Sequence, residues 1–237
     1  MRRMLRGLVF DMDGVLIDSH PAHRSAWKTF LESLGKRTSD DELDFILDGR
    51  KREEILKYFL GDLTPEQIAK YGNRKDELFS QRNQTMHPIP GVVQFLDILS
   101  ESGIPVAVAT SASRRRACGT LEELGLARTF QAIVTGDDIC SGKPDPAIYQ
   151  LAAQRLQESP RYLLAVEDAV SGVRSARAAG LQCLAISSGR RADLLRAAGA
   201  DPVIPDFRLL SLAQLEASFD RLFERTMNDE AMPKPIS

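Results

Sequence analysis

Short apolar runs alternate with amphipathic stretches along most of this chain, which predicts a parallel sheet covered by helices. The runs that are short and apolar enough to be buried strands are residues 5–10, 104–109, 132–134, 162–166, 182–186 and 203–204. The stretches of helical spacing between them are residues 92–102, 114–124, 145–156, 170–179 and 192–198. Strands that alternate with helices of this length form a sheet with helices on both faces. We therefore expect an α/β core with a Rossmann-like, doubly wound parallel sheet.

The stretch from residue 18 to residue 87 lacks this alternation and has helical spacing throughout. Pro21 suits the first turn of a helix, and apolar residues recur after it at intervals of three or four. Ser39 and Thr64 have the spacing of helix-capping residues. The helix that begins at Thr64 is expected to run as far as Gln84. No strand is predicted anywhere in this stretch.

A turn-rich segment at residues 87–91 ends the helical stretch. The pattern therefore predicts two domains. Residues 1–17 and 88–237 form the catalytic core, and residues 18–87 form an all-helical cap domain inserted into it. The small, polar and proline residues from about residue 228 predict a loose tail.

Chemically useful side chains follow the predicted strands at the points where the strands end. Ligands of open parallel sheets bind beyond the carboxyl ends of the strands. The residues at these ends and in one loop are Asp11, Asp13, Thr110, Ser111, Lys143, Glu167 and Asp168. Each alone is typical of a turn, a helix cap or a solvated surface. Their coincidence at one edge of the sheet indicates a functional site.

Asp11 and Asp13 are expected to point to the same side, because side chains two residues apart share one face of a strand. Two carboxylates that close repel each other unless a cation lies between them or one is protonated. Asp11 is ionised at neutral pH and can attack phosphorus as a nucleophile. Asp13 can act as general acid and base, which requires a raised pKa for the first proton transfer.

The other strand-end residues complete an inventory for phosphoryl transfer. Thr110 can donate a hydrogen bond to a phosphate oxygen, and Lys143 can balance the charge of Asp11 and the phosphoryl group. Glu167 and Asp168 can complete a cation site. Mg2+ held by oxygen ligands neutralises the phosphate dianion before an anionic nucleophile approaches.

The chain resembles the haloacid dehalogenase superfamily of phosphotransferases. The motifs that carry the resemblance are Asp11-Met12-Asp13-Gly14-Val15, Thr110-Ser111, Gly142-Lys143-Pro144-Asp145-Pro146 and Glu167-Asp168. The resemblance implies a helical cap inserted after the first motif. It implies Asp11 as nucleophile and Asp13 as acid/base, with Thr110 and Lys143 on the phosphate. It also implies Mg2+ on Asp11, the main-chain carbonyl of Asp13 and Asp168, with Glu167 nearby.

Within this superfamily the chain is similar to β-phosphoglucomutase and the sugar-phosphate phosphatases around it. His23 falls where the mutase has a cap histidine. Gly49 and Arg52 fall where the mutase has the glycine and arginine that face the second phosphate of its substrate. The resemblance adds Ser111 and Arg114 as further candidates for substrate binding.

Two departures from the mutase pattern count against a mutase. Asp48 replaces a lysine just before the glycine, and residues 112–114 read Ala-Ser-Arg in place of Ser-Lys-Asn. His23, Arg52 and Arg114 also have structural interpretations. His23 can be a polar residue on an exposed helical turn, and both arginines can lie on solvated helix faces.

Composition limits which binding partners and which cellular compartment we expect for this protein. A net charge of -2 gives no reason to expect nucleic acid or an anionic membrane as partner. The three cysteines are widely spaced, which argues against a zinc site or a disulfide framework and favours the cytoplasm. We expect a monomer or weak homodimer that acts on a small phosphorylated substrate.

The expected activity is that of a Mg2+-dependent phosphatase for a sugar phosphate or similar metabolite. The first alternative is a phosphosugar mutase of the β-phosphoglucomutase kind. A metal-independent, halide-releasing hydrolase is a second alternative, although it has no alcohol to protonate with Asp13. A non-catalytic binding module is the third.

Overall fold

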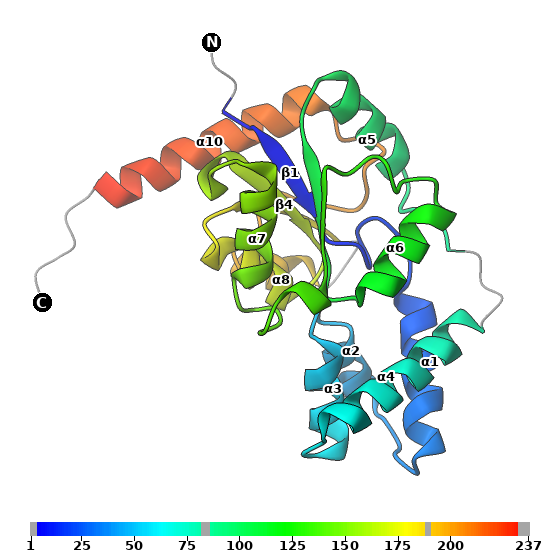
Figure 1. The fold of residues 1–237 in the computed structure, drawn as a ribbon. Coiled ribbons are helices and arrows are strands. Elements are labelled where there is room, and N and C mark those ends of the chain that lie inside the picture. Colours follow the sequence, from blue (N-terminus) through cyan, green and yellow to red (C-terminus); the bar gives the residue numbers. More distant parts are fainter. Residues whose placement is uncertain (1–3, 82–85, 188–190, 232–237) are drawn as a thin grey trace, which may run out of the picture.

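A parallel six-stranded sheet lies at the centre of the computed structural model, which describes residues 4–81, 86–187 and 191–231 (Figure 1). The strand order is β3-β2-β1-β4-β5-β6, and every neighbouring pair is parallel. The strands are β1 (Gly7–Phe10), β2 (Val106–Ala109), β3 (Ala132–Val134), β4 (Leu163–Glu167), β5 (Gln182–Ile186) and β6 (Val203–Ile204). The predicted doubly wound α/β fold is confirmed, because the order reverses at β1, between β2 and β4.

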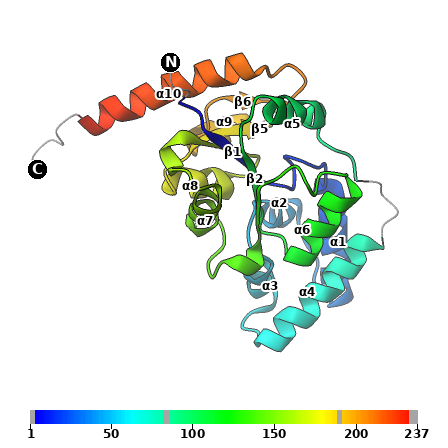
Figure 2. The same ribbon diagram turned by 45° about the horizontal axis from the view of Figure 1, so that its top comes forward.

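Helices cover both faces of this sheet, which explains why its strands are apolar on both sides. In β1, Leu8 and Phe10 pack in one core with residues of α5, α6 and α10, whereas Val9 packs in the other with α7, α8 and α9. Figure 2 shows α5 and α6 on one side of β1 and β2, and α7 and α8 on the other. The helices are α5 (Val92–Glu101), α6 (Arg114–Glu123), α7 (Ala147–Leu156), α8 (Val170–Ala178), α9 (Ala192–Ala197) and α10 (Leu212–Ala231).

The described part of residues 18–87 contains four helices, which lie together below the sheet in Figure 1. They are α1 (His20–Ser33), α2 (Asp40–Ile46), α3 (Arg52–Leu60) and α4 (Pro65–Ser80). Ser39 and Thr64 form the predicted capping boxes of α2 and α4. Residues 18–87 are called the helical insertion below, and its helices share a small core of their own around Trp27 and Phe30.

The helical insertion leaves and rejoins the core at one place. The amide of Asp18 donates to the carbonyl of His87 at 2.9 Å, and the amide of Ile89 donates to that of Leu16 at 3.0 Å. These bonds lie at the boundaries predicted for the cap domain. Helix α4 ends at Ser80, and residues 82–85, over which it was expected to continue, lie outside the described residues.

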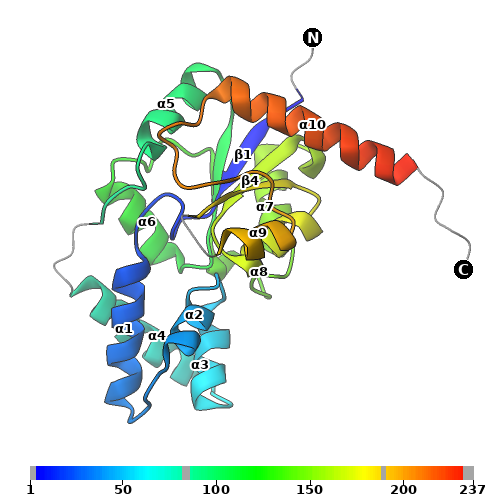
Figure 3. The same ribbon diagram turned by 180° about the vertical axis from the view of Figure 1, so that it is seen from behind.

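Helix α10 is not among the predicted elements, although its sequence carries a helical signal. Ser211 and Gln214 form a hydrogen-bonded cap at its start, and Leu215 and Phe219 are buried at a spacing of four residues. It reaches Ala231, so the prediction of a loose tail is wrong for residues 228–231. Its C-terminal end extends beyond the core (Figure 3). None of the described helices, α10 included, combines the length and apolarity that a membrane span requires.

Candidate active site

Asp11 follows β1 at the carboxyl edge of the sheet and is fixed by its backbone. Its amide donates to the carbonyl of Val166 in β4 at 2.9 Å, which continues the strand ladder by one residue. The next turn is anchored by Met12, whose carbonyl accepts from the amides of Leu16 and Ile17. Gly14 has φ +78°, and a Cβ there would lie 2.2 Å from a carboxylate oxygen of Asp168. Only glycine lets this turn approach the end of β4.

Lys143 links the two central strand ends. Its side chain is fully buried, and Nζ donates to Asp11 Oδ1 at 2.6 Å, Glu167 Oε1 at 2.5 Å and the carbonyl of Ala109 at 3.1 Å. Tyr149 donates its hydroxyl to the same Glu167 oxygen at 2.6 Å. The ammonium group therefore balances two buried carboxylates, and residues from three strands and α7 converge on it.

Among the described residues, Asp11, Glu167 and Asp168 offer carboxylate oxygens that lie within 4.8 Å of one another. Burial raises the pKa of Asp11 to about 8, although Lys143 opposes the rise, and Glu167 adds to it. The expected ionisation of Asp11 at neutral pH is therefore not favoured by the protein residues alone. A divalent cation among these oxygens would supply the missing positive charge, and an all-oxygen donor set is the one that Mg2+ prefers. The acidic cluster therefore fits the expected metal.

Glu167 depends on a glycine of helix α8. A Cβ at Gly172 would lie 2.1 Å from the Glu167 carboxylate, so even alanine cannot be accommodated without moving a buried charge. We expect Gly172→Ala to lower the free energy of unfolding by about 1–3 kcal/mol, measured by urea denaturation. Gly119→Ala in α6 is the matched control, because a Cβ there meets open space. It should be neutral or stabilise the protein by up to about 1 kcal/mol, and an equal loss in both variants would contradict this packing.

Asp13 lies in a different environment from that of Asp11. Arg116 of α6 grips its carboxylate with both terminal nitrogens, Nη1 at 3.0 Å from Oδ1 and Nη2 on Oδ2. Ser19 donates to Oδ1 at 2.6 Å, and His23 Nε2 lies 3.2 Å away. Burial raises the pKa of Asp13, but Arg116 and His23 outweigh burial and hold it well below its ordinary value. The raised pKa that an acid role requires is therefore not what this arrangement produces.

His23 joins Asp13 to the helical insertion. Lys75 of α4 lies 3.0 Å from His23 Nδ1, and the histidine ring lies 4.4 Å from that of Phe79. Burial and Lys75 lower the pKa of His23 to about 3. A neutral imidazole between an ammonium and a carboxylate accepts at Nδ1 and donates from Nε2 to Asp13. His23 is buried, which excludes the interpretation as a polar residue on an exposed turn.

Gly49 and Arg52 line the same cavity as His23. Arg52 Nη1 pairs with Asp76 at 2.9 Å, and its side chain lies over Gly72, where a Cβ would be 2.5 Å from Nε. The carbonyl of Gly49 accepts from Ser111 Oγ at 2.6 Å, so Ser111 ties the helical insertion to the core. Thr110 is buried beside Ser111, accepts from an amide at its own Oγ1, and can still donate its hydroxyl proton to a ligand.

Asp48, the residue that departs from the mutase pattern, faces the core. Its Oδ1 accepts from the amide of Ser171 at the start of α8 at 3.3 Å, and its carbonyl accepts from the Ser171 hydroxyl. Lys51 donates to the carbonyl of Ile139 at 2.7 Å. These contacts hold the helical insertion against the core beside Gly49.

Arg114 lies away from the cavity. Its guanidinium pairs with Asp138 at 2.6 Å, its side chain is about half exposed, and it does not line the cavity that contains Asp11. Two residues further along α6, Arg116 enters that cavity instead. Position on the helix decides the difference, because residues two apart point to different sides.

Both parts of the molecule line one cavity of about 200 Å3. Lys143 and Glu167 lie behind its wall, and the residues that line it include Asp11, Asp13, His23, Trp27, Gly49, Arg52, Lys75, Thr110, Ser111, Arg116 and Asp168. Asp11, Asp168 and several cationic side chains therefore share one cavity.

The sequence prediction did not include Lys75, Arg116, Tyr149 or His20. His20 Nε2 pairs with Asp168 at 3.1 Å. For Lys75 a signal exists, because it stands on the apolar face of α4, four residues after Tyr71 and four before Phe79. For Arg116 none exists, because it is the last of three consecutive arginines and only packing distinguishes them.

Comparison with known proteins identifies the family to which the chain is similar. The model of the haloacid dehalogenase-like hydrolase family matches residues 8–186. A phosphorylated carbohydrates phosphatase of Thermotoga maritima is 32% identical over 182 residues, which cover 75% of this chain and 83% of that protein. A β-phosphoglucomutase of Bacillus subtilis is 30% identical over 228 residues, which cover 92% and 96% of the two chains.

A solved structure of a similar protein has the same fold. CbbY from Rhodobacter sphaeroides in complex with phosphate superimposes with a TM-score of 0.77 at 29% identity, covering 90% of this chain and 99% of that one. Its fold is therefore shared over nearly the full length of both chains. The chain belongs to the haloacid dehalogenase-like hydrolase family, and it is an enzyme of the phosphatase and phosphomutase kind found among its relatives.

Proposed function

We propose that this protein is a Mg2+-dependent phosphatase that hydrolyses a small phosphorylated metabolite, a sugar phosphate, through an aspartyl-phosphate intermediate. The observation that carries the proposal is the position of Asp11. It lies at the strand edge as part of the acidic cluster, pairs with Lys143, and lines a cavity that also holds several cationic side chains. A relative named phosphorylated carbohydrates phosphatase supports the substrate class.

In the first half-reaction an Asp11 carboxylate oxygen forms a bond to phosphorus as the bond from phosphorus to the alcohol oxygen breaks. The departing oxygen keeps the bonding electron pair and takes a proton from Asp13. Thr110 donates to the phosphoryl oxygens, and Lys143 balances the charge on Asp11. Mg2+, held by Asp11 and Asp168 with Glu167 nearby, would neutralise charge on the phosphoryl group.

In the second half-reaction a water oxygen attacks phosphorus and the bond to Asp11 breaks, which regenerates the Asp11 carboxylate. Asp13 takes the proton from that water and is ready for the next cycle. The ionised form favoured by Arg116 and His23 is the form that this step needs. The first step needs the protonated form, so Asp13 must lose part of its contact with Arg116 before the alcohol leaves.

The helical insertion, residues 18–87, acts in this proposal as a cap over the cavity. Contacts of Gly49 with Ser111 and of Lys51 with Ile139 hold it against the core. A cap that closes over bound substrate excludes bulk water and selects among phosphorylated metabolites. The core fixes the reaction, and the cap fixes the substrate.

A phosphosugar mutase is the second candidate, because a relative named β-phosphoglucomutase covers almost the whole chain. His23, Gly49 and Arg52 favour it. Asp48 opposes it, because its carboxylate binds the start of α8 where a mutase lysine would stand. Product analysis with β-glucose 1-phosphate separates the two. We expect glucose and inorganic phosphate, and glucose 6-phosphate formed in the presence of a trace of bisphosphate would establish a mutase.

Divalent metal should control both activity and stability. Adding Mg2+ at about 100 times its dissociation constant should contribute about 2.7 kcal/mol, which raises Tm by roughly 5–10 °C for a chain of this length. EDTA should abolish hydrolysis of a sugar-phosphate panel. Asp168→Asn should lose the Mg2+-dependent Tm shift, measured by differential scanning fluorimetry. Asp137→Asn is the control, because Asp137 lines the cavity outside the acidic cluster. Hydrolysis of a haloacid that survives EDTA would point to the halide-releasing alternative.

A further inference from the structure

A glycine in the interior of α4 gives Arg52 its position in the helical insertion. Gly72 is buried in the middle of that helix, where glycine is less favourable than alanine. A Cβ at Gly72 would lie 2.5 Å from Nε, 2.6 Å from Cζ and 2.7 Å from Cδ of Arg52. The absence of a side chain at Gly72 therefore leaves the space in which the arginine lies against α4.

Asp76, one turn after Gly72, holds the guanidinium of Arg52 in this place. Arg52 Nη1 donates to Asp76 Oδ2 at 2.9 Å, and Lys75 Nζ lies 3.5 Å from the other oxygen of that carboxylate. Arg52 and Asp76 both line the cavity that contains Asp11. In the proposed reaction phosphorus lies next to Asp11 on the core side of the cavity. The pair of Arg52 and Asp76 therefore lies on the side left for the alcohol portion of the substrate.

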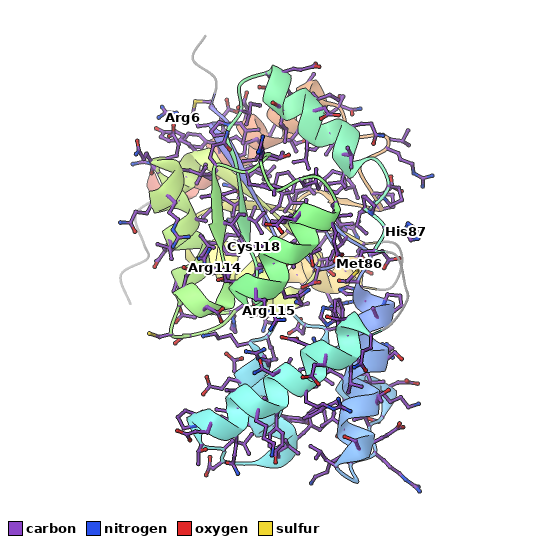
Figure 4. The ribbon with its side chains drawn as sticks, turned by 45° about the vertical axis from the view of Figure 1, so that its right-hand side comes forward. Arg6, Met86, His87, Arg114, Arg115 and Cys118 are labelled. Carbon is purple, nitrogen blue, oxygen red and sulfur yellow. The ribbon has the colours of Figure 1, made fainter. Side chains whose placement is uncertain are left out.

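Helix α6 contributes one cation to the cavity, and that cation is already paired. Arg114 and Arg115 are exposed and do not line the cavity, and Figure 4 labels both on the same helix. Arg116 lines the cavity and contacts both carboxylate oxygens of Asp13. A second anionic group on the substrate would therefore have to take this guanidinium from a carboxylate.

The remaining lysines and arginines of the cavity have partners within the protein as well. Lys51 donates to two main-chain carbonyls of the core, and Arg50 lies 3.9 and 4.0 Å from two carboxylates. Among the described residues that line the cavity, carboxylates are at least as numerous as lysines and arginines. A divalent cation and a phosphate dianion add equal and opposite charges, so substrate binding leaves no surplus of positive charge for a second anion.

A guanidinium paired with a carboxylate suits a hydroxyl group. A hydroxyl both donates and accepts hydrogen bonds, whereas a guanidinium only donates and an ionised carboxylate only accepts. Arg52 and Asp76 together therefore match the hydroxyl groups of a sugar or polyol. A second phosphate dianion or a carboxylate on the substrate only accepts, and Asp76 repels it in a cavity where solvent screens charges weakly.

We propose that Arg52 and Asp76 determine specificity by selecting substrates whose alcohol portion is uncharged. The pair binds hydroxyl groups of a sugar or polyol monophosphate, and Asp76 excludes alcohols that carry a second phosphate or a carboxylate. The inference rests on the proposed function and narrows its substrate class. It also removes Arg52 from the features that favour a mutase, because a guanidinium paired with Asp76 does not grip a second phosphate.

Substrates that differ in one anionic group test this selection. Glucitol 6-phosphate and 6-phosphogluconate differ in a hydroxymethyl group against a carboxylate, and fructose 1-phosphate and fructose 1,6-bisphosphate differ in a second phosphate. Each is assayed with Mg2+ on the parent enzyme, Asp76→Asn, Arg52→Gln and the control Glu77→Gln. Glu77 is the next residue of α4, pairs with Arg74 and is not among the residues that line the cavity. p-Nitrophenyl phosphate reports phosphatase activity without a polyol.

We expect the parent and Glu77→Gln to prefer the uncharged member of each pair by about tenfold or more in kcat/KM, because like charges brought together at a binding site cost affinity. Asp76→Asn should lower this preference by about tenfold, chiefly through a lower KM for the anionic member, because Arg52 then carries an unpaired charge. Arg52→Gln should raise the preference, because the carboxylate of Asp76 then loses its guanidinium partner. A merely structural role would not move the ratio in opposite directions.

Three results would overturn the inference. A parent enzyme that hydrolyses p-nitrophenyl phosphate and does not prefer the uncharged member in both pairs refutes the selection and leaves the proposed phosphatase intact. An unchanged ratio in either Asp76→Asn or Arg52→Gln, with the fold of the variant checked by circular dichroism, shows that the pair does not discriminate by charge. A parent enzyme that hydrolyses none of the substrates with Mg2+ refutes the proposed function, and the inference with it.

Discussion

Asp11→Asn is expected to lower the hydrolysis of any phosphate ester by at least about ten-thousand-fold, the order expected when a nucleophile is lost. The amide cannot attack phosphorus, whereas its size and its hydrogen bond from Lys143 are nearly unchanged. Phosphate release with purified variant and parent measures the effect. A variant that turns over substrate as fast as the parent would show that the nucleophile is another group.

The same variant should fold at least as stably as the parent in metal-free buffer. Burial raises the pKa of Asp11 from 3.8 to about 8, so the protonated form is favoured in the folded protein. The stability that this proton contributes is complete below about pH 4 and is lost as the pH rises towards 8. Asparagine has no such charge, so the Tm difference in favour of the variant should grow over that range. A variant Tm far below that of the parent would indicate that the loss of activity reflects unfolding.

Lys143→Met should lower the free energy of unfolding by about 3–5 kcal/mol at neutral pH, the usual result of removing one partner from a buried ion pair. Lys143 is fully buried, and without it Asp11 and Glu167 face each other with no described cation between them. Urea denaturation in metal-free buffer measures the loss. Activity should disappear as well, because the ammonium no longer balances the charge of the nucleophile.

A second variant separates the charge effect from packing. Lys143→Met combined with Glu167→Gln removes the unbalanced charge of Glu167 and keeps an oxygen for the hydroxyl of Tyr149. We expect this double variant to recover at least about 1 kcal/mol relative to Lys143→Met, since coupled neighbours are not additive. A double variant that is destabilised by the sum of both single changes would show that the carboxylates do not depend on the lysine.

The core of this fold follows from local pattern. Residues of β1 such as Val9 and Phe10 belong to an apolar run too short for a helix and buried on both faces, which only a covered parallel strand explains. Because carboxyl ends of parallel strands share one edge, the sequence alone predicts that Asp11 and Glu167 lie close together. Helix α10 was not predicted, because its apolar positions lie beyond the last strand, where strands and helices no longer alternate.

The protonation states of the site residues do not follow from local pattern, as Asp13 shows. Its proximity to Asp11 was predictable from a spacing of two residues. Its low pKa depends on Arg116, which is more than a hundred positions away along the chain and belongs to a run of three arginines. Lys75 similarly acts on His23 from another helix. Electrostatic effects depend on distance in space, so no local pattern contains them.

The sequence thus predicts the class of fold, the edge of the sheet that carries the site, and the kind of chemistry. It can do so because backbone periodicity and the residues that follow each strand are local properties. Tertiary structure decided which arginine enters the cavity, what Asp48 binds, and which form of Asp13 is favoured. These depend on how α4 and α6 pack around one cavity and on where the start of α8 meets Asp48. Burial there strengthens the interactions between charges brought together from distant segments.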